Sequence, residues 1–271
     1  EARHGALAPI DLPAIPQHVA QRGNDRQTCF AGEAGYLRYL QELRGASSRH
    51  DCAIHAYVLM TNHVHLLVTP ATTGAISRMM QAVGRRYVGS FNARTGAGTL
   101  WERRFKAALV DTDRYLLTCY RYIELNPVRA HMTDDPADYP SSHHHNAMGQ
   151  PAPLITPHQQ YMLLATTPAT RQAAYRALVD ELVEEKHLDD LRQHTQQQRA
   201  WGSERSRQQI EALTQRSVSV SLAADPGART GETASPCLDP CAESILARYL
   251  LLLRVVADMR CQFNGQRILE Q

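Results

Sequence analysis

The order of hydrophobic patterns along residues 17–126 limits the possible fold more than any other feature of this sequence. Four short segments are expected to be β-strands: 17–24, which ends in a polar turn, 53–59, 63–69 and 101–111. Three segments carry apolar residues at helical spacing: 33–50, 75–92 and 112–126. The resulting order predicts an α+β fold of the ferredoxin-like (RRM-like) class. In that fold an antiparallel sheet carries helices on one face, and here a further helix follows the last strand.

Composition places few demands on function, but the charge is unevenly spread. The net charge of the 271 residues is only +2. Residues 78–106 nevertheless carry seven basic side chains against Glu102 alone, whereas 180–190 carry six acidic side chains against Lys186. The six cysteines form no C-x-x-C pair, which argues against a zinc ribbon or a disulfide framework. Neither an apolar signal core nor a membrane span is evident, so we expect a soluble intracellular protein.

The strand expected at 63–69 carries two histidines inside an apolar run, in the segment YVLMTNHVHLLVT (57–69). Alternation along a strand places His63 and His65 on one face, and the apolar residues around them on the core face. Two such imidazoles, about 7 Å apart at their Cα atoms, could bind one cation, although the pair does not select a particular metal. The alternative is a solvent-facing histidine pair without a role.

The last expected helix contains Tyr122 and Asn126, which lie four residues apart and therefore share a helix face. Tyrosine is a poor nucleophile at its ordinary pKa of about 10, but a divalent cation and arginines favour the phenolate. Together with the histidine pair, Tyr122 could attack a phosphodiester and hold the 5′-phosphate covalently. The alternatives are a core tyrosine and a helix-ending asparagine, and Tyr115 and Tyr120 are rival nucleophiles.

Five segments resemble the REP-associated tyrosine transposases, which are single-tyrosine members of the HUH endonuclease superfamily related to insertion-sequence transposases. The segments are PQHVAQRGNDRQTCF (16–30), HAYVLMTNHVHLLVTP (55–70), MQAVGRRYVGSFN (80–92), GTLWERRFKAALVD (98–111) and YLLTCYRYIELNPVRA (115–130). The resemblance implies that His63 and His65 are metal ligands, that Tyr122 is the nucleophile, and that Asn126 completes or supports the metal site.

The resemblance also implies the cofactor, the substrate and the location. Mg²⁺ or Mn²⁺ is the expected cofactor. Single-stranded DNA with palindromic hairpin repeats is the expected partner, and the reaction is cleavage and strand transfer through a 5′-phosphotyrosine intermediate. The enzyme is expected to be a monomer or a homodimer in the bacterial cytoplasm, associated with the nucleoid.

The resemblance extends from about residue 8 to 155, and weakly through 201–213. We therefore expect a transposase domain at 8–155, a helical and basic extension at 156–216, a flexible linker at 217–241 and a tail of unknown role at 242–271. Within the extension, 158–190 and 192–216 both look helical. The segment PSSHHHNA (140–147) departs from the family pattern; we interpret it as a loop, although its histidine tract could also bind a metal.

Nucleic-acid contacts are expected from basic and polar residues that, as a set, accompany a phosphodiester-cleaving centre. They are Arg22, Asn24, Arg26, Arg85, Arg86, Arg103, Arg104, Lys106, Arg205 and Arg207. For any single arginine, a solvated surface position is the commoner outcome. The aromatic residues among them could stack on bases, but most are expected in the core: Tyr87, Phe91, Trp101 and Phe105.

Two other functions fit the same residues. The first is a non-catalytic protein that binds hairpin DNA on the same fold. The second is an H-x-H metallohydrolase acting on small molecules, which would need further carboxylate or histidine ligands on other strands. A metal-dependent covalent DNA adduct would distinguish the transposase from both.

Overall fold

A computed structural model describes residues 10–96, 98–111, 114–142, 154–181 and 183–220 of the chain. Residues up to Gly202 belong to one compact unit, and a second unit begins at Ser203. The histidine tract at 143–145, most of the expected linker and the whole of the expected tail lie outside the described residues.

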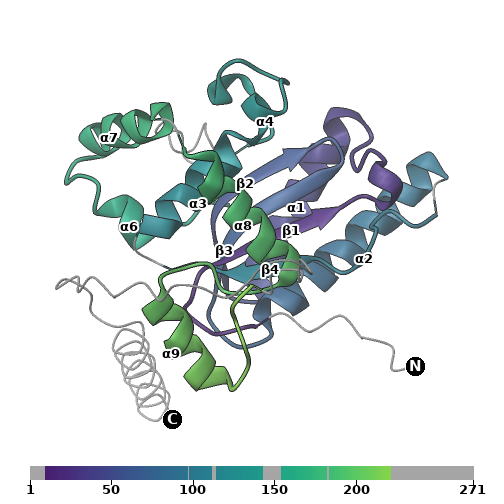
Figure 1. Cartoon of the computed structure of the whole chain (residues 1–271). Helices are drawn as coiled ribbons and strands as arrows, with labels where there is room; N and C mark the ends of the chain where they lie inside the picture. Colours follow the sequence, from purple (N-terminus) through teal and green to yellow (C-terminus); the bar gives the residue numbers. More distant parts are fainter. Residues whose placement is uncertain (1–9, 97, 112–113, 143–153, 182, 221–271) are drawn as a thin grey trace, which may run out of the picture. The chain divides into compact units, whose positions relative to one another are not determined.

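The first unit is built on a four-stranded antiparallel sheet with the order β2-β3-β1-β4 (Figure 1). Its strands are β1 (Gln17–Arg22), β2 (Cys52–Met60), β3 (His63–Pro70) and β4 (Lys106–Leu109). Helices α1 (Gly32–Arg49) and α2 (Ala75–Thr95) connect strands in the order that the sequence predicts. The predicted ferredoxin-like fold is therefore confirmed.

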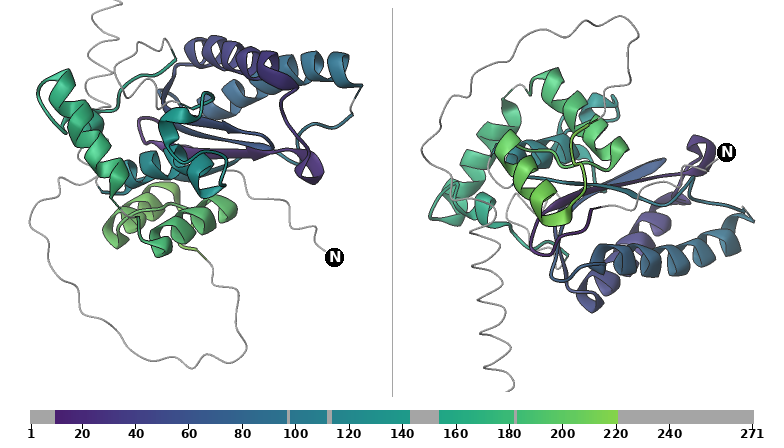
Figure 2. Two further views of the ribbon diagram at one scale, coloured as in Figure 1. Left: turned by 90° about the horizontal axis from the view of Figure 1, so that it is seen from above. Right: turned by 60° about the horizontal axis from the view of Figure 1, so that its bottom comes forward.

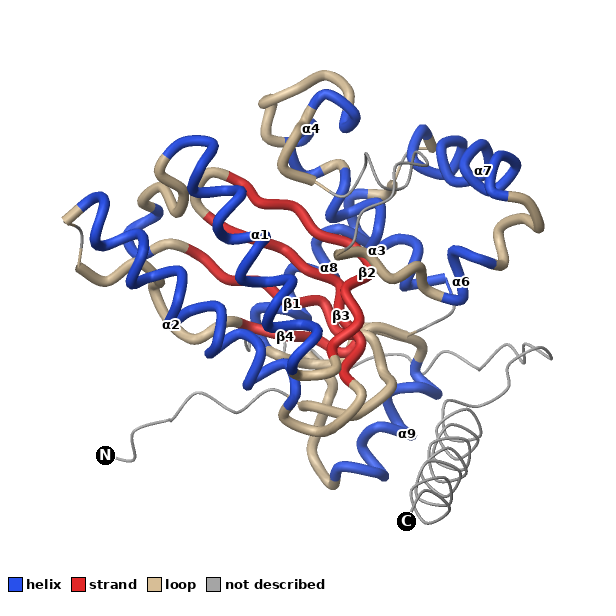
Figure 3. The backbone as a smooth tube through the Cα atoms, turned by 180° about the vertical axis from the view of Figure 1, so that it is seen from behind, coloured by secondary structure: helices blue, strands red, loops and turns tan. Residues whose placement is uncertain are grey.

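Helices cover both faces of this sheet, whereas the sequence suggested helices on one. The pair α1 and α2 packs together along one face, as Figure 3 shows from behind. The other face is covered by α3 (Arg114–Glu124) and by α8 (Glu185–Gln197), which contacts β4 and β1. Figure 2 shows the sheet edge-on between these two helical layers.

Two apolar cores result, one on each face. On β3, Val64, Leu66 and Val68 enter the core under α1 and α2, while Leu67 enters the core under α3 and α8. The aromatic residues of the basic segment pack in the first core: Tyr87, Phe91 and Phe105 are buried there, and Trp101 is partly buried against it. The expectation that most of them are core residues is confirmed.

The fourth strand is shorter than the predicted 101–111. Only Lys106–Leu109 pair regularly with β1, and Arg103 and Arg104 lie exposed in a bend before the strand. An isolated bridge pairs Trp101 with Gly23. On the outer side of β4, at the edge of the sheet, Trp201 pairs in parallel with Val110, the residue after the strand. The segment after α8 thus shields part of the sheet edge.

The helical region after residue 126 is more broken than predicted. A short helix, α4 (Asn126–Arg129), follows α3 after a turn at Leu125, as Pro127 leads one to expect. In place of one helix at 158–190 there are α6 (Gln159–Met162), α7 (Pro168–Asp180) and the beginning of α8. In place of one helix at 192–216 there are the end of α8 and, in the second unit, α9 (Glu204–Thr214).

Two short 3₁₀ helices complete the described elements: η1 (Asn24–Arg26) and η2 (Pro136–Asp138). Within the described residues, no helix combines the length and the apolar content needed to span a membrane.

Candidate active site

Strand β3 presents its two histidines on the sheet face opposite α1 and α2. In the register of β1 and β3, Arg22 lies opposite His63, and Ala20 lies opposite His65. Because side chains alternate, the same face of β1 also carries His18. Three imidazoles therefore gather on one face. Helices cover this face: His65 is only 8% exposed and His18 only 1%, whereas His63 is partly exposed.

Each imidazole has a partner at its Nδ1 atom. His63 Nδ1 lies 2.6 Å from Asn62 Oδ1, and His65 Nδ1 lies 2.9 Å from His18 Nε2. His18 Nδ1 in turn lies 2.7 Å from the hydroxyl oxygen of Thr195 on α8. The structure thus orders both histidines of β3 through the same ring atom.

Burial keeps these imidazoles neutral. It lowers the pKa of His18 to about 3. Burial, with the nearby charge of Arg22, lowers the pKa of His63 to about 4. Burial also holds the pKa of His65 well below its ordinary value, and the neighbouring His18 adds to that effect. Neutral imidazole is the form that coordinates metal ions, so no proton has to leave at neutral pH.

Helix α3 places Tyr122 against the histidines. Its ring meets His65 edge-on at a centroid distance of 5.4 Å, and meets His18 at 5.5 Å. The Arg129 guanidinium carbon lies 4.8 Å from the ring centroid, and that of Arg192 lies 5.9 Å from it. Arg129 also donates a hydrogen bond to the carbonyl oxygen of Tyr122. Two cations therefore flank the tyrosine.

The rival tyrosines lie elsewhere. Tyr115 packs edge-on against Trp201, with 5.0 Å between ring centroids. Tyr120 is buried against Tyr175, and burial raises its pKa further from the range in which a phenolate forms. Of the three candidate nucleophiles, only Tyr122 lies beside the histidine pair.

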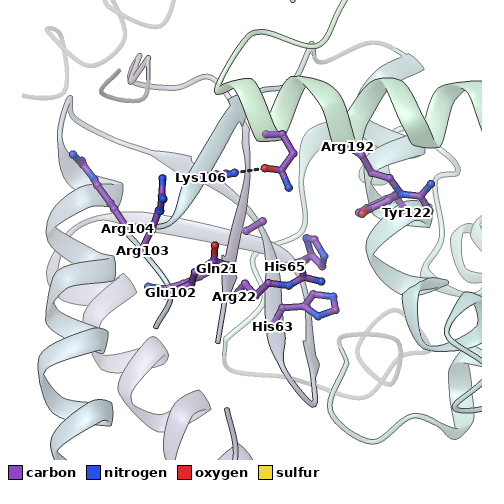
Figure 4. Close-up of a pocket in the computed structure, with 12 residues that line it drawn as sticks. Gln21, Arg22, His63, His65, Glu102, Arg103, Arg104, Lys106, Tyr122 and Arg192 are labelled. Carbon is purple, nitrogen blue, oxygen red and sulfur yellow. Dashed lines mark hydrogen bonds between the residues drawn. The ribbon is translucent and has the colours of Figure 1, made fainter. Parts of the chain in front are cut away.

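A cavity of about 400 Å³ opens between these side chains and β4 (Figure 4). Its basic lining comes from Arg22, Arg103, Arg104, Lys106 and Arg192. His63, His65 and Tyr122 also line it, and Glu102 is its single acidic lining residue. Lys106 donates a hydrogen bond to Gln196 of α8. The cavity is therefore suited to a polyanionic ligand.

The structure brings four of the predicted nucleic-acid contacts to this cavity: Arg22, Arg103, Arg104 and Lys106. The other six lie elsewhere. Asn24 and Arg26 form η1, just after β1. Arg85 and Arg86 lie on α2, on the other side of the sheet, and Arg86 lies 3.4 Å from Glu42. Arg205 and Arg207 lie on α9 in the second unit, where Arg207 pairs with Glu204 at 2.5 Å.

Asn126 does not line the cavity in the described structure. The predicted face shared by Tyr122 and Asn126 assumed one continuous helix, but α3 ends at Glu124 and Asn126 begins α4. The two residues remain one turn apart along the chain, on either side of the break at Leu125.

Sequence reasoning missed four residues of the site: His18, Arg129, Arg192 and Gln196. Alternation along β1 places His18 on the face of Arg22, which was a usable signal. Nothing in the local pattern indicates that α8 returns to the sheet. For Arg192 and Gln196 the sequence indicated only that they lie in a basic helical stretch, 192–216, and not that this stretch reaches the site.

Within the described residues, no group of three or more His, Cys, Asp or Glu side chains could hold a metal ion. The histidine pair itself fits a divalent cation in another way. Both rings use Nδ1 for a protein partner and keep Nε2 for a ligand. Imidazole nitrogen binds several divalent cations, and two such ligands leave the other coordination positions of the cation to water and substrate phosphates.

Residues 13–126 match the family model described as "Transposase IS200 like". This part of the chain therefore resembles the IS200-like transposases. The match includes all four strands, the histidine pair and Tyr122. The family identity predicted from the sequence segments is thus confirmed.

Solved structures of transposases also resemble the chain at low sequence identity. One is a REP-associated tyrosine transposase bound to a REP hairpin, with 16% identity and a TM-score of 0.48, covering 57% of this chain and 92% of that one. Another is a putative transposase from Deinococcus radiodurans, with 16% identity and a TM-score of 0.31, covering 49% of this chain and 97% of that one. No curated protein matches the chain.

Proposed function

We propose that the IS200-like transposase domain is a metal-dependent single-stranded DNA endonuclease and strand transferase that acts at hairpin-forming repeats. The observation that carries this proposal is the position of Tyr122, edge-on to His65 in the wall of a cationic cavity. A transposase must cleave DNA, and this is the place in the described structure where a nucleophile, imidazoles and cations meet.

Tyr122 is the proposed nucleophile. Its hydroxyl oxygen gives up its proton and forms a bond to phosphorus, while the bond from phosphorus to the 3′ oxygen breaks and that oxygen takes up a proton. The 5′-phosphate then stays on the tyrosine, and a 3′-hydroxyl is released. Attack by another 3′-hydroxyl reverses these steps and joins strands, because the phosphotyrosine conserves the energy of the phosphodiester bond.

The basic residues of the cavity hold the DNA. Arg22, Arg103, Arg104 and Lys106 lie along the two neighbouring strands β1 and β4 and the bend that precedes β4, and they would neutralise phosphates next to the scissile one. Arg192 is positioned beside Tyr122, where negative charge develops as the bond to phosphorus forms.

Mg²⁺ or Mn²⁺ is the proposed cofactor, held by Nε2 of His63 and His65. When bound, the cation would supply Lewis-acid polarisation of the scissile phosphate. The chain's contribution is to hold both imidazoles neutral and oriented. Asn126 remains the proposed residue that completes or supports the metal site.

Hairpin repeats in single-stranded DNA are the proposed substrate, and the bacterial cytoplasm, with its nucleoid, is the proposed location. The family resemblance supports both proposals. Either a monomer or a homodimer is compatible with this reaction.

A covalent-adduct assay tests the proposed function. The protein is incubated with labelled single-stranded hairpin DNA and Mn²⁺, and denaturing gel electrophoresis then separates protein–DNA adducts. We expect a shifted band for the wild type and for Tyr115→Phe, the matched control that removes a tyrosine hydroxyl outside the cavity. The band should be absent for Tyr122→Phe, His63→Ala and the wild type in EDTA.

Other outcomes identify the rival functions. A band that persists in Tyr122→Phe means that another residue attacks. Hairpin binding by the wild type without a band supports the non-catalytic binding protein. Hydrolysis of a small phosphodiester without any adduct supports the metallohydrolase.

A further inference from the structure

His18 has both ring nitrogens engaged by the protein. Its Nδ1 lies 2.7 Å from Thr195 Oγ1, and its Nε2 lies 2.9 Å from His65 Nδ1. The rings of His18 and His65 are stacked, with centroids 5.0 Å apart and an interplanar angle of 12°. With no nitrogen left over, His18 is not itself a third metal ligand.

The contact between His18 and His65 allows two proton arrangements. In the first, His65 Nδ1–H donates to His18 Nε2, and His18 Nδ1–H donates to Thr195 Oγ1. In the second, the Thr195 hydroxyl donates to His18 Nδ1, and His18 Nε2–H donates to His65 Nδ1. Because neutral imidazole carries one proton, the second arrangement puts that proton on His65 Nε2 and removes its lone pair.

We propose that His18, held by Thr195, is a positioning residue that fixes the proton of His65 on Nδ1 and so leaves Nε2 free to bind a cation. This inference rests on the proposed function, since a cation-binding His65 is what the first arrangement serves. Partners of this kind orient metal-bound histidines and set their tautomer in many metal sites.

The neighbouring histidine is supported in the same way by a different side chain. His63 Nδ1 lies 2.6 Å from Asn62 Oδ1. The Asn62 amide nitrogen donates to the carbonyl oxygen of Arg26 at 3.4 Å, which orients its oxygen toward the imidazole. An acceptor at Nδ1 therefore keeps Nε2 of His63 unprotonated. In the first arrangement, His65 likewise carries its proton on Nδ1 and keeps Nε2 unprotonated.

Thr195 is also well placed to hold His18 still. It is buried on α8, and the next residue, Gln196, accepts a hydrogen bond from Lys106 on β4. One turn earlier, Arg192 lies over the Tyr122 ring. Three side chains of α8 therefore contact the site. One contacts the His18 imidazole, one contacts Lys106 on β4, and one lies over the Tyr122 ring.

The first test reads the tautomer directly in the metal-free wild-type protein. Long-range ¹H–¹⁵N correlation spectra of the imidazole rings show which nitrogen of each histidine carries the proton. We expect the proton of His65 on Nδ1. A proton on Nε2 would overturn the inference, and this result does not depend on whether the protein binds metal.

The second test measures Mn²⁺ affinity by titration calorimetry. His18→Leu removes the acceptor for His65 and should weaken binding by about 10- to 100-fold. His18→Gln can keep an oxygen acceptor near the Nε2 position and should recover most of the affinity. Thr195→Val should weaken binding less than His18→Leu, and Thr195→Ser should bind like the wild type.

Thr69→Val is the matched control, because Thr69 makes the same kind of contact with His55, at 2.8 Å, outside the site. Its Mn²⁺ affinity should equal that of the wild type. If His63→Ala binds Mn²⁺ as tightly as the wild type, the proposed metal site is wrong. If His63→Ala loses binding but a folded His18→Leu does not, the metal site stands and the role of His18 is refuted.

Discussion

Arg103 and Arg85 are both exposed and both belong to the predicted nucleic-acid contacts, but they lie on different surfaces. Arg103 lines the cavity, whereas Arg85 lies on α2 behind the sheet. We expect Arg103→Gln to weaken binding of single-stranded hairpin DNA and to reduce the slope of log affinity against log salt by about 0.7, the value for one lost phosphate contact. Arg85→Gln should change neither quantity.

Fluorescence anisotropy at several salt concentrations measures both effects. Equal losses in the two variants would mean that the DNA also follows α2, as the basic segment 78–106 suggested from sequence alone. The position of Arg86 beside Glu42 argues against that path, because part of the positive charge on α2 is already neutralised.

Replacing glycine by alanine should change the free energy of unfolding in opposite directions at two positions. Gly84 lies in the middle of α2, and a Cβ added there meets nothing within 4 Å. Gly84→Ala should raise the free energy of unfolding by about 0.5–1 kcal/mol, because glycine costs backbone entropy within a helix. A Cβ on Gly23, at the end of β1, would lie 2.5 Å from the Gln27 carbonyl oxygen and 2.8 Å from Cys29 Sγ.

Gly23→Ala should therefore lower the free energy of unfolding by about 1–3 kcal/mol through overpacking. Urea denaturation followed by circular dichroism measures both variants against the wild type. A neutral result for Gly23→Ala would show that the turn after β1 can move by several tenths of an ångström.

Elements with strong local patterns could be predicted from the sequence, and elements that depend on distant contacts could not. Alternation along β3 correctly separates His63 and His65 from the core residues Val64, Leu66 and Val68. The extent of β4 depends on pairing with β1, and a local pattern does not contain that pairing. The return of α8 to the sheet depends on contacts such as Lys106 with Gln196, far apart in the sequence.

The same distinction explains the site. Tyr122 and the histidine pair were predictable because chemically informative residues stand in short motifs. The packing of His18 against His65 needed the register of β1 and β3. Asn126 begins α4 instead of continuing α3, since Pro127 sets where the second helix begins, and the local pattern does not show whether its side chain reaches the cavity.

The folded protein as a whole should lose stability in acid through histidines shielded from water, including two outside the site: His55, which is buried, and His158, which is half-buried. Burial lowers the pKa of His158 to about 4, with a further contribution from His55, and burial likewise lowers the pKa of His55. Below pH 6.5 the unfolded chain binds a proton at His158 that the folded chain does not bind until about pH 4. The stability is complete above pH 6.5 and falls as the pH is lowered toward 4.

The variant His158→Asn isolates this contribution. In the wild type, His158 Nδ1 accepts a hydrogen bond from the Gln160 amide at the start of α6, and asparagine is also a good N-cap. The variant should match the wild type near pH 7. Between pH 6.5 and 4, its unfolding free energy should fall less steeply, by at most about 1.4 kcal/mol per pH unit. Identical pH profiles in urea denaturation would contradict the assignment.

Helix α8 has a consequence for how the protein is made. The ribosome releases the histidine strand and Tyr122 well before Thr195 and Gln196, which contact the site from α8. A nascent chain, or the product of a gene interrupted before Glu185, would leave Leu67 and Val110 without the α8 side of their core. Such a product would contain the histidine pair and Tyr122 without the contacts that α8 makes to the site. The chain would then become able to cut DNA only late in synthesis, after α8 has been translated.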